Sequence, residues 1–283
     1  MKARSSVFFT LLMGILFISS CDIGGPNNEE LKSLILEAEP NLKSYSYEEG
    51  RLVSRLNMHR RVIEFFDSRS KMNSKGDVDR INRKAHFESS INSGYYLIDI
   101  FEMIPEFKSV YESQGQYSFS NNSFQGYSDL LQGPDFSATW QTVESDWNDI
   151  DRVGRVVEII KNSDITQIED EEISGVAYYV INVSVDSLGI LDFVFDRDLK
   201  GVENLHNDIK NYYLKAWVNK ETFFIEKVEI EVFADLESPI TKQDFVDSDL
   251  GPLPLDYNVL ESTSSLDFKI SNINKEVSVS GTE

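Results

Sequence analysis

The three histidines and the single cysteine of this chain are among the side chains whose types could bind a metal ion or attack a substrate. His59, His86 and His206 are far apart in the sequence and form no His-x-x-x-His pair, so their spacing does not predict a zinc site. The sequence contains no Gly-x-Ser-x-Gly motif, no phosphate-binding loop and no dinucleotide-binding fingerprint. We therefore expect a protein that is not an enzyme and uses no metal and no cofactor.

An acidic segment over residues 238–256 comes nearest to a cation site. Asp247 and Asp249 are spaced as in a calcium-binding loop, but the twelfth position, which should hold glutamate, is Asn258. We therefore expect an acidic surface loop here, with no bound metal ion.

Cys21 follows an apolar segment at the start of the chain. Lys2 and Arg4 precede a run of twelve mostly apolar residues, Val7–Ile18, and two serines come directly before the cysteine. A positive start, a short apolar run and small residues at the end are typical of an export signal. Twelve helical residues rise only about 18 Å, which is too short for a bilayer core of about 30 Å.

The four residues Ile18-Ser19-Ser20-Cys21 resemble the lipobox of prokaryotic lipoproteins. In that family the cysteine sulfur receives a diacylglyceryl group and becomes the first residue of the mature protein, and two acyl chains give stable anchoring. The resemblance implies a signal peptide over residues 1–20 and a lipid anchor at Cys21. It places the protein on the extracytoplasmic face of a membrane, in the periplasm or at the cell surface. An ordinary secretory signal, or a buried apolar helix, is the alternative.

Composition restricts the possible partners. The formal charge of −21 repels phosphate backbones, which argues against nucleic-acid binding. No second cysteine is available for a disulfide, so the core must hold the domain together unaided. The polar, glycine-containing residues 21–28 indicate a short flexible tether, followed by a single domain over residues 29–283. Sequons at Asn121 and Asn182 matter only if the host glycosylates proteins.

Two segments have the apolar spacing of amphipathic helices. The first begins near Asn28 and ends before Pro40, because proline disfavours helical geometry in the residue before it. The second covers the sequence NDIDRVGRVVEIIKN, in which either Asp149 or Asp151 is suited to cap the N-terminus.

The rest of the chain is rich in β-branched and aromatic residues separated by turn-forming residues. Strands or hairpins are predicted in the following ranges: 76–91, 115–127, 175–185, 189–196, 212–233 and 266–270. Residues 95–107 fit either a strand or a short helix, and residues 128–148 are predicted to be mostly irregular.

One predicted strand shows how the sheet is buried. Val228, Ile230 and Val232 alternate with charged residues, which is typical of an antiparallel strand with one buried and one wet face. Helices and antiparallel strands together indicate an α+β fold.

The order of several segments resembles the LolA/LppX-like lipoprotein-carrier superfamily, in particular its lipid-anchored prokaryotic members of uncertain cargo. After the lipobox and first helix, LKSYSYE (Leu42–Glu48) and KGDVDRINRKAHF (Lys75–Phe87) are similar to the start of the family's sheet and its early hairpin. The segment Ser163–Asp186 is similar to the entry into the central strands, and LKAWVNKETFFIEKVEIEV (Leu214–Val232) to the family's later hairpin.

The resemblance implies a strongly curved antiparallel sheet, an incomplete barrel, with helices covering its concave face. It also implies a hydrophobic cavity between helices and sheet that holds a lipid or other hydrophobic ligand, for transfer or sensing. Trp217, Phe224, Val228, Ile230 and Val232 are the candidate cavity residues. Ordinary core packing explains the same residues equally well, so the alternative is a non-catalytic cell-surface interaction or scaffold protein with a filled core and an unknown protein partner.

Overall fold

The structure is a computed structural model, and it describes the larger part of the chain. The described residues are 25–59, 64–97, 107–121, 123–132, 141–144, 147–185, 209–235, 257–277 and 279. The predicted signal peptide, Cys21 and the first part of the predicted tether lie outside them. The predicted strand over 189–196 and the acidic loop over 238–256 also lie outside them.

The first predicted helix is confirmed as α2 (Asn28–Ala38). Its N-terminus is held by a capping box, in which the side chain of Asn27 accepts from the Glu30 N–H at 3.0 Å and the Glu30 carboxylate accepts from the Asn27 N–H at 3.1 Å. The helix passes into the short 3-10 helix η1 (Glu39–Asn41), which contains the proline expected to end it.

The second predicted helix is also confirmed, and Asp151 is its N-cap. Helix α4 (Arg152–Lys161) begins where the Asp151 carboxylate accepts from the Gly154 N–H at 3.2 Å. A further short helix, α3 (Trp147–Ile150), precedes it. The region predicted to be mostly irregular therefore contains regular structure, because short elements leave little periodicity in a sequence.

Among the described residues, eleven strands form one sheet, and every neighbouring pair is antiparallel. The strands are β1 (Ser44–His59), β2 (Glu64–Asp79), β3 (Lys84–Leu97), β4 (Phe107–Ser120), β5 (Ser123–Gln132), β6 (Gln141–Glu144), β7 (Asp164–Ile173), β8 (Val176–Ser184), β9 (Ile209–Asn219), β10 (Ile225–Asp235) and β11 (Tyr257–Ser271).

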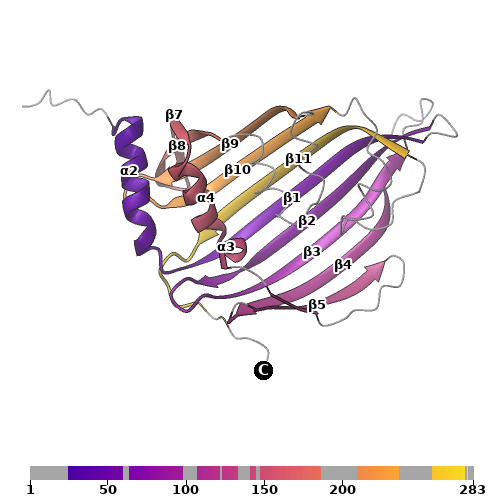
Figure 1. The fold of residues 1–283 in the computed structure, drawn as a ribbon, viewed down its shortest axis with the longest axis horizontal. Helices are drawn as coiled ribbons and strands as arrows, with labels where there is room; N and C mark the ends of the chain where they lie inside the picture. The colour runs from indigo at the N-terminus through magenta and orange to yellow at the C-terminus, as the bar shows by residue number, and fades with distance from the viewer. Residues whose placement is uncertain are drawn as a thin grey trace, which may run out of the picture.

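The sheet is built from two meanders that meet in its middle. The order is β6-β5-β4-β3-β2-β1-β11-β10-β9-β8-β7, so the chain runs outward from β1 to one edge and crosses over through α3 and α4 (Figure 1). It then returns from the other edge until β11 pairs with β1. The two edge strands, β6 and β7, do not pair with each other, so the predicted α+β fold with an open, barrel-like antiparallel sheet is confirmed.

Three hairpins predicted from the sequence are present. Strands β2 and β3, β4 and β5, and β9 and β10 pair as predicted, with turns that follow Asp79, Ser120 and Asn219. The segment of ambiguous type, residues 95–107, begins in β3 and ends in β4, and its middle lies outside the described residues.

The two faces of the sheet differ, as the alternation in β10 predicts. Val228, Ile230 and Val232 are buried on the face that carries the helices, which we call the inner face. Lys227, Glu229 and the residues paired with them point to the opposite side, which we call the outer face.

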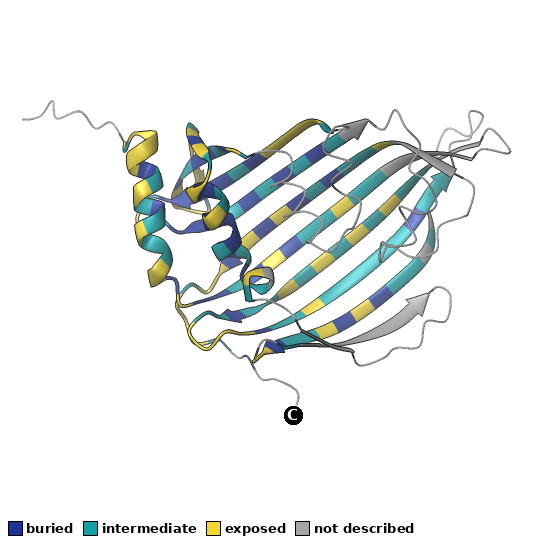
Figure 2. Cartoon of the chain, viewed as in Figure 1, coloured by how far each residue is buried: buried dark blue, intermediate teal, exposed yellow. Residues whose placement is uncertain are grey.

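The helices cover only one end of the inner face (Figures 1 and 2). Strands β1 and β2 have 16 residues each, a length of about 50 Å. The core lies where the first residues of β1 and the last residues of β11 meet α2 and α4. Beyond this point the inner face continues without a helix among the described residues.

Candidate functional site

The space between the helices and the sheet is filled by packed side chains. Helix α2 contributes Leu31 and Ile35, and α4 contributes Val156 and Ile160, each of them at most 1% exposed. Aliphatic residues recur on α2 and α4 at helical spacing, so both helices turn an apolar side toward the sheet. The covered end of the sheet is therefore an ordinary hydrophobic core.

Four of the five predicted cavity residues belong to this core. Phe224, Val228, Ile230 and Val232 are all buried in the main hydrophobic cluster. Phe224 lies in the turn before β10, while the other three follow each other along β10. Ile230 and Val232 lie furthest from the turn, toward the part of the inner face that continues beyond the helices.

The structure does not bring Trp217 together with these four residues. Trp217 is paired with Lys227 across β9 and β10, and so it points to the outer face. There it forms a small separate cluster with Tyr178 and Val180, and its indole N–H donates to Glu171 Oε2 at 2.6 Å. The Lys227 ammonium lies 4.1 Å from the centre of the indole ring. The composition of this hairpin did not show that Trp217 faces the opposite side, because that depends on the register of β9 with β10, which is irregular between Ile225 and Lys227.

Beyond the helices, the inner face carries the half-buried apolar side chains of Met72 and Ile91 beside serines and the charged Arg51. Cross-strand partners lie on one side of a sheet, and the pairing Leu266–Arg51–Met72–Ile91 continues the row of Ile230. Met72 and Ile91 are half-buried. The sequence did not indicate these residues, because serines occupy the neighbouring positions on the same face and leave no apolar alternation.

An aromatic row borders this apolar region. Its members lie on the inner face of β11, β1, β3 and β4 and are Phe268, Tyr47, Phe87 and Tyr117. Phe87 and Tyr117 stack with ring centres 5.2 Å apart, and Tyr47 lies 5.7 Å from Phe268. The row leads from the packed core, where Phe268 is buried, to the half-buried Tyr117.

Gly76 allows this row to form. It lies between Tyr47 and Phe87 in the register, and a Cβ placed on it would come within 2.3 Å of the His86 carbonyl oxygen. Only glycine permits such a close approach.

The carboxylate of Glu49 is buried beside the first residue of α4, at the limit of the inner-face area that this helix covers. Glu49 accepts from Arg51 Nε at 2.5 Å and forms an ion pair with Arg152 Nε at 3.3 Å. Its side chain is 2% exposed, so the two guanidinium groups replace the water it has lost. Burial, with the Glu49 charge adding to it, raises the pKa of Tyr47 to about 12. This group attaches α4 to β1.

A second polar group fixes α4 to the hairpin between β2 and β3. Arg80 donates from Nε to Asp151 Oδ2 at 2.7 Å, and from Nη1 to the carbonyl oxygens of Glu39 and Leu42. The hydroxyl of Tyr45 donates to the other Asp151 oxygen at 3.0 Å. Burial is the main cause that raises the pKa of Tyr45 well above its usual value, and the Asp151 charge adds to it.

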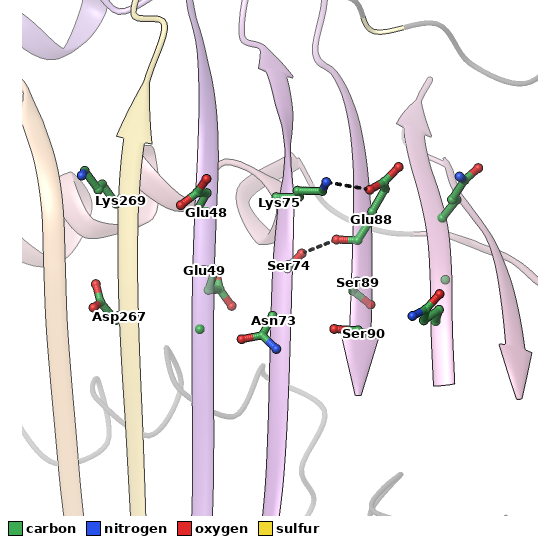
Figure 3. Close-up of a pocket in the computed structure, with 14 residues that line it drawn as sticks. Glu48, Glu49, Asn73, Ser74, Lys75, Glu88, Ser89, Ser90, Asp267 and Lys269 are labelled. Carbon is green, nitrogen blue, oxygen red and sulfur yellow. Dashed lines mark hydrogen bonds and ion pairs between the residues drawn. The ribbon is translucent and has the colours of Figure 1, made fainter. Parts of the chain in front are cut away.

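A hollow of about 790 Å³ lies on the outer face across β11, β1, β2, β3 and β4 (Figure 3). Seen from the outer side, the helices lie behind the sheet and the side chains of Asn73, Lys75, Glu88 and Asp267 lie in front. Lys75 and Glu88 form an ion pair at 3.2 Å. Apart from two glycines, the residues that line it are polar or charged, unlike those of the apolar cavity that the resemblance implies.

A second hollow of about 290 Å³ adjoins the first along β1. The two share Gly50 and Asp267 in their linings. Tyr213 and Leu52, which line the second hollow, are 38% and 39% exposed. Polar residues alternate along the strands that line the two hollows, and this alternation is visible in the sequence. Without the register between the strands, these residues could not be assigned to one site.

No group of three or more histidine, cysteine or acidic side chains in the described part of the chain is placed to hold a metal ion. Of the histidines, His86 lies in β3, and His206 falls outside the described residues. The described residues also include no helix that is long and apolar enough to cross a bilayer.

Several solved structures match most of this chain at low sequence identity. Lipoprotein LppX from Mycobacterium tuberculosis is 12% identical with a TM-score of 0.40, and the match covers 90% of this chain and 100% of that chain. LprF from Mycobacterium bovis is 13% identical with a TM-score of 0.40, covering 91% of this chain and 99% of that one.

A domain from Vibrio parahaemolyticus, described as an outer membrane lipoprotein-sorting protein, is 10% identical with a TM-score of 0.23 and covers 91% of this chain and 96% of its own. No protein-family model matches the sequence, and no curated protein sequence matches it.

Proposed function

We propose that this protein is a non-catalytic lipoprotein, anchored through Cys21 to the extracytoplasmic face of a membrane, that binds a lipid or other hydrophobic ligand for transfer or sensing. The observation that supports the binding role is the extent of the inner face. The helix layer ends near Glu49, while the inner face continues beyond it with the apolar side chains of Met72 and Ile91, next to Arg51.

An apolar ligand laid along this row gains free energy from the water that it releases. Each buried CH₂ group contributes about 0.8 kcal/mol, so an acyl chain needs few polar contacts. Ile230 and Val232, two of the predicted cavity residues, lie in the same rows as Arg51 and Val53 and mark the inner end of the site. Phe224 and Val228 lie nearer the turn, in the packed core, and hold this end of the site in place.

The test is native mass spectrometry on residues 22–283, purified without detergent from a lipid-rich host, with identification of the extracted lipid. Removing residues 1–21 removes none of the described structure. We expect a stoichiometric mass excess that disappears on denaturation.

A matched pair of variants locates the ligand. Ile91→Asn places an amide on the inner face, and Ser90→Asn places the same amide on the outer face one residue away. The mass excess should be lost in the first variant and kept in the second. Equal retention in both would contradict an inner-face site.

The tight core favours a second candidate function. Val228 and Ile230 are at most 1% exposed against helices α2 and α4, as expected of an interaction or scaffold protein with a filled core. A bare protein mass, unchanged after incubation with a lipid extract, would favour this function over ligand binding.

A further inference from the structure

We propose that the outer face binds a neutral oligosaccharide along the two adjoining hollows. This inference is independent of the hydrophobic site, because it concerns the opposite side of the sheet. It starts from the lining of the larger hollow, where Asn73, Ser90, Gln114 and Gln116 lie side by side on three neighbouring strands.

These amides and hydroxyls supply both donors and acceptors. An asparagine or glutamine side chain offers an NH₂ donor and a carbonyl acceptor, and a serine hydroxyl offers either. Sugar hydroxyls need the same mixture, since each one donates and accepts. Gly50 leaves the middle of the hollow open, because a Cβ placed there would meet only Asn73 Oδ1, at 3.9 Å.

The charges of this surface are nearly balanced, although the whole chain carries −21. The outer-face lining of the larger hollow has three carboxylates, on Glu48, Glu88 and Asp267, and two ammonium groups, on Lys75 and Lys269. Because Lys75 is also paired with Glu88, neither a polyanion nor a polycation finds complementary charge here. The balance favours an uncharged ligand.

Tyr213 supplies an aromatic surface in the smaller hollow, at the end of the proposed binding surface away from Gln114 and Gln116. Its ring is 38% exposed on the outer face, in the lining of the smaller hollow. It is held there by a hydrogen bond with Glu231, its partner across β9 and β10. The CH side of a sugar ring packs on such an aromatic face while its hydroxyls remain hydrogen-bonded.

The distance between the two parts sets the size of the ligand. Tyr213 lies on β9 and Asn73 on β2, four strands away in the sheet order. Four spacings of about 4.8 Å make roughly 19 Å. This length requires a chain of several sugar rings.

The test is titration of the full chain, solubilised in a detergent without a sugar headgroup, with tetrasaccharides of β-linked glucose, α-linked glucose and β-linked N-acetylglucosamine. Saturation-transfer NMR detects contact and calorimetry gives the affinity. We expect saturable binding of at least one of the three, unchanged by added salt because the ligand has no charge.

Tyr212 is the matched control for Tyr213. The two are neighbours in β9 with nearly equal exposure, 37% and 38%, but Tyr212 lies on the inner face, paired with Val232. Tyr213→Ala should weaken binding by about tenfold or more, as should Gln114→Ala, whereas Tyr212→Ala and Ile91→Asn should leave it unchanged. No binding of any tetrasaccharide, or equal losses in Tyr212→Ala and Tyr213→Ala, would overturn the proposal. Thermal melts of each variant confirm that it is folded.

Discussion

Arg80 and Asp151, 71 residues apart in the chain, form an ion pair of 2.7 Å in which the arginine of the β2–β3 hairpin contacts the residue that caps α4. The side chains are only 14% and 5% exposed. Both partners also bind other groups: Arg80 holds the carbonyl of Leu42, and Asp151 accepts from Tyr45. One contact thus attaches the crossover helix to the sheet that it covers.

Replacing Arg80 should therefore destabilise the fold strongly. Arg80→Ala leaves the buried Asp151 carboxylate without its cation, and we expect a loss of about 3 kcal/mol in the free energy of unfolding. Arg80→Lys keeps the charge but loses the forked geometry, so its loss should be smaller but measurable. Urea denaturation followed by circular dichroism measures both. Arg69→Ala, which removes an exposed ion pair with Asp67, is the control and should cost less than about 1 kcal/mol.

The buried tyrosines make the fold sensitive to alkali. Burial raises the pKa of Tyr45 well above its usual value and that of Tyr47 to about 12. A raised pKa means that stability is fully present below the unfolded value of about 10 and is lost as the pH rises from there toward the folded pKa. The free energy of unfolding should fall above pH ~10, by up to about 1.4 kcal/mol per pH unit for each tyrosine. Tyr47→Phe should flatten this dependence, and an equally steep fall in that variant would contradict the assignment.

Two glycines on neighbouring strands should respond differently to the same substitution. Gly76→Ala places a Cβ 2.3 Å from the His86 carbonyl, and the backbone must move to relieve the clash. We expect a destabilisation of about 1–3 kcal/mol. Gly50→Ala meets nothing closer than 3.9 Å and should be neutral or slightly stabilising. Melting temperatures of the two variants give the comparison, and equal shifts would show that close packing at Gly76 is not the cause.

The lipid anchor predicted from residues 18–21 is tested by a single atom change. Cys21→Ser removes the sulfur that would carry the diacylglyceryl group, so the protein should lose its lipid and leave the membrane fraction. Mass spectrometry of the N-terminal peptide and cell fractionation follow the two effects. A variant that stays in the membrane fraction as strongly as the unchanged protein would instead support an uncleaved apolar segment.

Local signals carried most of the fold prediction. The cap at Asp151, one of the two aspartates predicted for it, the Pro40 stop and the alternation through Val228 and Ile230 act over a few residues, and the structure confirms each of them. The open antiparallel sheet followed from such elements together with the family resemblance.

The candidate site was harder to predict because it depends on register between distant strands. Trp217 seemed by composition to belong with Phe224, yet it lies on the other side of the sheet. Glu49 sits in a run that looks like a solvated surface, although Arg51 and Arg152 bury it. The ion pair of Arg80 with Asp151 joins residues for which no local pattern indicates proximity.

The pairing of β1 with β11 has a consequence for how the chain matures. The first strand acquires its second neighbour only from the last, more than 200 residues later, and Ser46 pairs directly with Ser271. Such non-local contacts slow folding and leave strand edges open in the meantime. A chain that emerges from its N-terminal end therefore exposes the edge of β1 until β11 has arrived. During this interval the open edge of β1 is available for pairing with a neighbouring copy.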